Sequence, residues 1–186
     1  MLPAFTFRYA EAADAGVIAA LVNSAYRGLQ SRQGWTTEAD LLDGARTDIA
    51  DVAALIAKPA SILLLCLADD MLVGSVHLEQ DGALAKLGMF SVAPAQQARG
   101  IGKALMAEAE TAVASRWQSQ KIIMHVISVR TELIAFYVRR GYRLTGNQIA
   151  FPVHPDLWTP KVGALVLVEM EKLLLEATQK SAIIVL

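Results

Sequence analysis

The feature that most constrains the fold of this chain is a strand–turn–helix pattern in its middle. The apolar run LGMFSVAP at residues 87–94 has strand character and ends at Pro94. The polar stretch QARGIGK at residues 97–103 then opens a segment rich in alanine and leucine, which predicts a helix over residues 101–116. We therefore expect a helix that begins in a cluster of free backbone N–H groups directly after a strand.

That helix start predicts an anion site. The first turn of a helix carries partial positive charge and exposed donors. Gly100 and Gly102 lack the Cβ atoms that would hold a phosphate away from these donors, and Arg99 and Lys103 add full positive charges. We interpret the segment as a cradle for a pyrophosphate group. The alternative is a glycine-rich turn that only caps an ordinary helix.

Two common nucleotide loops do not match the cradle. A Walker loop requires G-x-x-x-x-G-K-[ST], but Gln97 replaces its first glycine and Ala104 replaces its hydroxyl residue. A Rossmann fingerprint requires a third glycine where Leu105 stands. The sequence therefore argues against an enzyme that binds nucleotide phosphates through either loop.

The cradle instead resembles the acyl-CoA loop of the GNAT superfamily of N-acetyltransferases. Gln97, Gly100 and Gly102 form its Q-x-x-G-x-G pattern after a V-x-P strand end, and AFYVRRGY at residues 135–142 resembles the second family signature. The resemblance covers residues 5–172. It implies transfer of an acetyl group from acetyl-CoA to a primary amine, by direct attack in a ternary complex, with a small amine or amino-acid-like metabolite as acceptor. The alternatives are a protein N-terminal or lysine acetyltransferase and a non-catalytic acyl-CoA-binding regulatory module.

The fold class expected from the resemblance and the hydrophobic patterns is α/β (α+β). We expect a single GNAT-type domain over residues 1–172, whose mixed central sheet has an antiparallel N-terminal meander, a splayed parallel strand pair and flanking helices. Strands are predicted over residues 5–10, 62–67, 72–79, 83–92, 121–129, 142–151 and 164–170. Helices are predicted after Asp14 and over residues 38–51, 101–116 and 131–140. The tail at residues 173–186 is expected to be an edge strand or a contact between the subunits of a homodimer.

Composition excludes several other classes. The net charge of −1 over 186 residues argues against a nucleic-acid partner or an anionic membrane surface. No run approaches the ~18 apolar residues of a membrane span, and no basic n-region opens the chain, so we expect a cytoplasmic protein. Cys66 lies in an apolar run and is interpreted as a buried, inert thiol. The three histidines have no metal-ligand spacing, so no metal is expected.

The resemblance places the cofactor contacts on three neighbouring segments. Main-chain groups of Phe90 and Val92 are implied to bind the pantetheine, with a backbone N–H near Phe90 facing the thioester oxygen. Arg140 either contacts the cofactor or only complements the dipole at the end of its helix. The complete set of cofactor-binding candidates is Phe90, Ser91, Val92, Gln97, Ala98, Arg99, Gly100, Ile101, Gly102, Lys103, Ala104, Phe136 and Arg140.

The catalytic candidates are a tyrosine and two glutamates. The resemblance implies that Tyr137 approaches the cofactor sulfur and protonates the departing thiolate; the alternative is an aromatic side chain that only packs its helix on the sheet. The strand at residues 83–92 has no carboxylate to serve as a base, which leaves Glu79 and Glu38 as candidates. For Glu79 the alternative is a solvated strand end, and the identity of the base stays open.

The acceptor site is expected to lie between two loop regions. Residues 26–38 and 151–161 form its predicted walls, and the substrate-binding candidates are Tyr26, Trp35, Phe151 and Trp158. The strand at residues 121–129 lacks the asparagine that often meets pantetheine in the family. Ser128 or His125 could substitute, but His125 stands among apolar residues and is interpreted as a core histidine.

Overall fold

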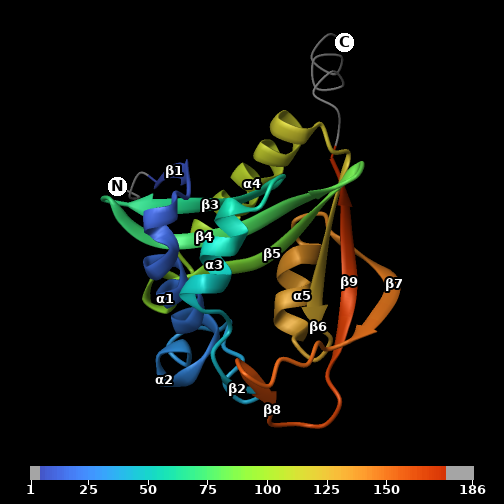
Figure 1. Ribbon diagram of the computed structural model, residues 1–186. Helices are drawn as coiled ribbons and strands as arrows, with labels where there is room; N and C mark the ends of the chain where they lie inside the picture. Colours follow the sequence, from blue (N-terminus) through green and yellow to red (C-terminus); the bar gives the residue numbers. More distant parts are fainter. Residues whose placement is uncertain (1–4, 175–186) are drawn as a thin grey trace.

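The structure, a computed structural model, describes residues 5–174 and contains one large and one small sheet. The large sheet has seven strands, which are, from one edge to the other, β1 (Phe5–Tyr9), β3 (Ser61–Ala68), β4 (Met71–Asp81), β5 (Leu84–Val92), β6 (Lys121–Ile127), β9 (Val166–Leu173) and β7 (Arg143–Ala150) (Figure 1). The small sheet pairs β2 (Leu42–Gly44) with β8 (Trp158–Pro160). The helices are α1 (Ala15–Tyr26), α2 (Gly28–Ser31), α3 (Ile49–Ala57), α4 (Ile101–Trp117) and α5 (Thr131–Val138), with single 3₁₀ turns at Ala12–Asp14 and Pro94–Gln96.

Helices cover both faces of the large sheet. On β3, Leu63 and Leu65 pack with α1 and α3, whereas Leu64 and Cys66 point to the opposite face and pack with α4. The sequence SILLLCLA has no polar alternation because both faces of this strand are buried. Cys66 is fully buried, as predicted, and burial raises the pKa of its thiol to about 11.

The predicted meander and the splayed parallel pair are both confirmed. Strands β3, β4 and β5 are antiparallel neighbours, and β5 pairs in parallel with β6 only from Leu84 to Leu87. Beyond that point β5 carries a bulge, because Gly88 pairs with His77 of β4 and Ser91 pairs with Ser75. Met89 within the bulge has a φ of 45°. The two parallel strands therefore separate halfway along the sheet.

The helix predicted over residues 38–51 is wrong. The structure has a turn and strand β2 there, and helix α3 begins only at Ile49, after Asp48 accepts a hydrogen bond from the Asp51 N–H at 2.8 Å. Gly44 has a φ of +86°, and a Cβ at this position would lie 2.1 Å from the carbonyl oxygen of Leu157. Pairing with β8, from the far end of the chain, thus overrides the local preference for a helix.

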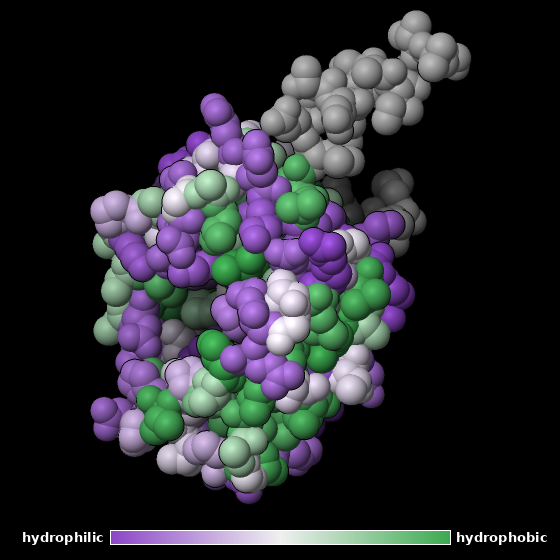
Figure 2. All heavy atoms as spheres, turned by 90° about the vertical axis from the view of Figure 1, so that its right-hand side faces the viewer, coloured by the Kyte–Doolittle hydropathy of each residue, from purple (hydrophilic) through white to green (hydrophobic). Residues whose placement is uncertain are grey.

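One further difference concerns the C-terminal half. The predicted loop region at residues 151–161 is not irregular throughout, because it contributes β8 to the small sheet. The final strand pair is confirmed, with β9 lying between β6 and β7. The side chains of edge strand β7 are mostly exposed, and Figure 2 shows hydrophobic residues scattered among hydrophilic ones on this side of the molecule.

The predicted tail at residues 173–186 begins at the end of strand β9. Strand β9 includes Leu173, so the sheet extends one residue into the range predicted as tail, and the remainder of that range beyond residue 174 lies outside the described residues. Within residues 5–174, no helix combines the length and apolar character needed to cross a membrane.

Candidate active site

Two cavities meet where β5 separates from β6. The first, the cradle cavity, has a volume of about 380 Å³ and lies against the start of α4. The second, the splay cavity, has a volume of about 270 Å³ and opens between the diverging strands. Tyr26, Phe90 and Leu133 line both cavities. Groups bound in the two cavities would therefore be separated by no more than these side chains.

The predicted cradle has the geometry of an anion site. Gly100 has a φ of +85°, and the first α-helical bond runs from the Ala104 N–H to its carbonyl at 3.0 Å. The N–H groups of Ile101, Gly102 and Lys103 precede this bond and so have no partner within the helix. Because Gly102 lines the cavity without a Cβ, a ligand can approach these donors closely. The chemistry and the shape of this wall fit a pyrophosphate.

Most of the predicted cofactor residues lie together in this cavity. Its lining includes Phe90, Val92, Gln97, Ala98, Gly100, Ile101, Gly102, Lys103, Phe136 and Arg140. Three predicted residues do not line it: Ser91 is buried against Ser75, Arg99 donates to Gln96 at 2.7 Å, and Ala104 lies inside the helix. Sequence analysis missed the contributions of Thr36, Gln96, Leu133 and Arg139.

The Gln97 side chain binds protein groups on both sides of it. Its Oε1 accepts from the Trp35 N–H at 2.9 Å, and its Nε2 donates to Thr36 Oγ1 at 2.8 Å and to the Val92 carbonyl at 3.1 Å. The most distinctive residue of the loop pattern therefore fastens the N-terminal loop to the end of β5. Trp35, predicted as an acceptor contact, consequently lines the cradle cavity and not the splay cavity.

Arg140 forms a cationic wall of the cradle cavity. Its guanidinium carbon lies 3.3 Å from the centre of the Phe136 ring, and its Nη1 donates to the Phe136 carbonyl at 2.6 Å. Burial and the nearby Arg139 lower the pKa of this guanidinium. Its Nε is buried without a hydrogen-bond partner among the described residues. An anionic ligand in this cavity would offer that donor an acceptor.

Tyr137 lies in the splay cavity with a free hydroxyl. The side chain is buried among Phe90, Phe136 and Tyr142, whose ring centres lie 5.4–6.3 Å away. Within residues 5–174, its hydroxyl makes no hydrogen bond, whereas the Tyr26 hydroxyl donates to the Phe90 carbonyl at 2.6 Å. Burial raises the pKa of Tyr137, so its phenol stays protonated and is available as a donor.

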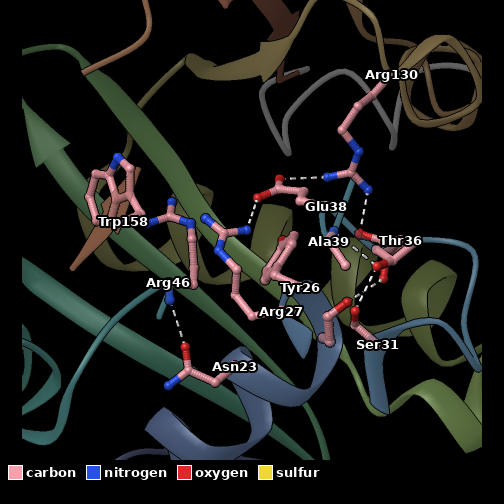
Figure 3. Close-up of polar contacts among 12 residues, drawn as sticks. Asn23, Tyr26, Arg27, Ser31, Thr36, Glu38, Ala39, Arg46, Arg130 and Trp158 are labelled. Atoms are coloured by element: carbon pink, nitrogen blue, oxygen red, sulfur yellow. Dashed lines mark hydrogen bonds and ion pairs between the residues drawn. The ribbon is translucent and has the colours of Figure 1, made fainter. Parts of the chain in front are cut away.

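Glu38 lies in the same cavity but is fully engaged with two arginines. One carboxylate oxygen accepts from Arg27, and the other accepts from Arg130 Nη1 at 2.8 Å (Figure 3). Arg130 also donates to the Thr36 carbonyl at 2.6 Å. The Glu38 side chain is only 8% exposed. A carboxylate held in this way fixes the loop in place and is poorly placed to accept a proton from a substrate.

Glu79, the other predicted base, lies outside both cavities. Its carboxylate pairs with Lys58 Nζ at 2.8 Å, which fits the alternative of a solvated strand end. His77 on the same strand is bonded to the Ser61 hydroxyl at 2.9 Å, and burial lowers the pKa of its imidazole. The structure therefore brings Tyr137 and Glu38 together but not Glu79.

The interpretation of His125 as a core histidine is wrong. Its neighbours Met124 and Val126 are buried, but His125 points to the other face, lines the splay cavity and is 32% exposed. Its Nε2 lies 3.8 Å from a carboxylate oxygen of Glu169. No local signal in the sequence marked it, because Ile123 and Ile127, on the same face of β6, are buried.

Comparisons with known proteins identify the family of this chain. The family model described as an acetyltransferase (GNAT) domain matches residues 44–152. The chain belongs to the GNAT acetyltransferase family. Within the matched range lie the cradle, the bulged strand β5 and the helix that carries Tyr137.

Individual relatives resemble this chain in sequence or in fold. Mycothiol acetyltransferase of Clavibacter sepedonicus is 34% identical over 111 residues, covering 60% of this chain and 34% of that protein. The chain thus spans about a third of that relative's length. Among solved structures, a putative phosphinothricin N-acetyltransferase has a TM-score of 0.70 at 16% identity, with 93% of this chain and 100% of that chain covered. The PaiA N-acetyltransferase of Thermoplasma acidophilum, in complex with coenzyme A, has a TM-score of 0.62 at 16% identity, with 92% and 99% covered.

Proposed function

We propose that this GNAT domain is an N-acetyltransferase for a small, amino-acid-like primary amine. The observation that carries the proposal is the meeting of the two cavities at the β5–β6 splay, with a protonated phenol beside it. When bound in the cradle cavity, acetyl-CoA supplies an acetyl thioester. The splay cavity then receives the acceptor amine from the opposite side.

The splay cavity supports a small acceptor in preference to a folded protein. It measures about 270 Å³, and its outer wall includes Phe151 and Trp158, whose rings lie 6.3 Å apart. Trp158 belongs to β8, whose pairing with β2 holds this wall in place. Of the predicted substrate contacts, Tyr26, Phe151 and Trp158 line this cavity.

Acetyl transfer to an amine panel tests the function. The full chain is incubated with acetyl-CoA and one amine at a time, and release of free thiol and formation of the acetylated amine are measured together. Amine-dependent turnover supports the enzyme. Binding of CoA without turnover of any small or peptide amine would instead support the regulatory module, and turnover of peptide amines alone would support a protein acetyltransferase.

The cradle assignment predicts a loss of CoA affinity in Gly102→Pro. Proline removes one of the free N–H groups in the first turn of α4, and a hydrogen bond to a charged group contributes enough to weaken binding ~10- to 100-fold. The matched control is Gly102→Ala, which keeps the N–H and places its Cβ 3.4 Å from Phe136. Calorimetric titration of CoA into both folded variants is the measurement. Equal affinity of Gly102→Pro and the unmodified protein would overturn the assignment.

We also propose that His125 accepts the proton of the acceptor ammonium. Among the described residues it is the one imidazole that lines the splay cavity, and its Nε2 lies 3.8 Å from a carboxylate oxygen of Glu169. His125→Gln should lower kcat/KM by ~100-fold or more at a pH below the acceptor's pKa. The variant should approach the unmodified enzyme above that pH, because solvent has then already removed the proton.

The control for this pH profile is the same substitution at a neighbouring histidine. His77→Gln removes an imidazole that is bonded to Ser61 and lies outside both cavities, so its profile should match the unmodified enzyme. A loss in His125→Gln that is the same at every pH would show that His125 positions the substrate and does not take its proton.

A further inference from the structure

Positively charged side chains outnumber negatively charged ones around the splay cavity. The phenol of Tyr26 lies within the field of one carboxylate, Glu38, and three guanidiniums, Arg27, Arg46 and Arg130. Figure 3 shows Glu38 between Arg27 and Arg130, with Arg46 placed toward Trp158. Glu38 is the only acidic side chain among the described residues that line this cavity. More positive charge is therefore built into this wall than its one carboxylate neutralises.

Arg46 is the arginine left without an anionic partner. Arg27 and Arg130 share the carboxylate of Glu38. Within residues 5–174 the guanidinium of Arg46 makes no hydrogen bond and no ion pair, although it lines the splay cavity and is only partly exposed. Arg46 therefore stands at the cavity with hydrogen-bonding capacity that the described residues do not use.

The structure holds Arg46 in place without using those donors. Its backbone N–H donates to Asn23 Oδ1 at 2.7 Å, and its guanidinium carbon lies 5.9 Å from the centre of the Trp158 ring. A guanidinium held by a cation–π contact keeps its N–H donors free for a ligand, and their planar fork matches the two oxygens of a carboxylate. A fixed, unpaired cation in an aromatic-walled cavity is suited to selecting an anion.

Resting on the proposed function, we propose that the acceptor amine carries a carboxylate and that Arg46 binds it. The cavity of about 270 Å³ has room for an amino acid, with Phe151 and Trp158 available to an apolar side chain. The same charge distribution disfavours an acceptor with several ammonium groups, because the described residues that line the cavity offer no free carboxylate to a second one. Arg46 thus selects the acceptor by binding its carboxylate and takes no part in the acetyl transfer itself.

The test uses product analogues, so that it does not depend on turnover. N-acetyl-L-phenylalanine and N-acetyl-L-phenylalaninamide differ by one carboxylate, and neither has an ammonium group whose pKa would confuse the comparison. Both are titrated into the CoA-loaded protein by calorimetry. We expect the acid to bind ~10- to 100-fold more tightly than the amide, the range typical for hydrogen bonds to a charged group. A matched acid and amide pair made from methionine extends the comparison beyond aromatic side chains.

Three variants identify the residue responsible. Arg46→Gln should weaken binding of the acids by ~10- to 100-fold and leave the amides unchanged, whereas Arg46→Lys should restore part of the preference. Arg32→Gln is the matched control, because Arg32 pairs with Asp40 and lies outside both cavities. Amides that bind as tightly as acids, or a loss in Arg46→Gln that affects both equally, overturns the proposal, as does failure of every analogue to bind. Absence of acetyl transfer to any amine, with the acid preference intact, would instead overturn the proposed function.

Discussion

Tyr137→Phe should lower the rate of acetyl transfer by ~100- to 1,000-fold while leaving CoA affinity nearly unchanged. The substitution removes only a hydroxyl, which lies in the splay cavity and has no hydrogen-bond partner in the part of the chain that the structure describes. Loss of one preorganised donor to charge that develops in a transition state has an effect of this size. Because burial raises the pKa of the phenol, complete proton transfer to a thiolate would be uphill, so we expect the hydroxyl to act by hydrogen bonding to the departing sulfur.

The measurement is the single-turnover rate, which isolates the chemical step from product release. Tyr142→Phe is the matched control, because its hydroxyl is also buried but is bonded to Met106 Sδ at 3.3 Å, away from both cavities. An unchanged single-turnover rate in Tyr137→Phe would reduce this tyrosine to a packing residue, which is the alternative that the sequence left open.

The second large effect is expected on stability. Glu38→Ala should lower the free energy of unfolding by about 3–5 kcal/mol, because it leaves the charges of Arg27 and Arg130 buried without their shared partner. The Thr36 region should loosen as well, since Arg130 is the donor to its carbonyl. Urea unfolding followed by circular dichroism measures the change.

Asp40→Ala provides the comparison for a carboxylate nearby in the sequence. Asp40 pairs with Arg32 at 2.6 Å, but its side chain is 73% exposed, so its removal should scarcely change the unfolding midpoint. A loss in Glu38→Ala no larger than in Asp40→Ala would contradict the structural role of Glu38. If Glu38→Gln were stable but lost activity mainly at low pH, Glu38 and not His125 would be the proton acceptor.

The central part of the fold was predictable because its signals are local. The strand β5, the cradle and helix α4 follow one another in the chain, and each is recognised from glycine placement and hydrophobic pattern. The helix that carries Tyr137 ends next to Gly141, whose φ of +87° explains the stop at that position. Contacts between neighbours in sequence therefore account for the wall of the cradle cavity at the start of α4, whereas Trp35 and Thr36 reach this cavity from a distant segment.

The acceptor side was harder because its contacts join distant segments. Residues 38–48 have the composition of a helix, yet β2 pairs with β8, more than one hundred residues away. The role of Glu38 depends on Arg130, from the start of α5, which no local pattern connects to it. His125 was misread because its apolar neighbours indicate burial, and only the separation of β5 from β6 exposes it.

The hydrogen bonds of Gln97 couple the loop that contains Gly34 and Trp35 to the end of β5. A Cβ on Gly34 would lie 2.7 Å from Gln97 Oε1, so a side chain at position 34 would displace the Gln97 side chain from its hydrogen bonds. Substitutions at these two positions will not have additive effects, since each alters the space and the hydrogen bonds on which the other depends. A segment near the N-terminus and the cofactor loop thus form a single rim, and neither can be redesigned without the other.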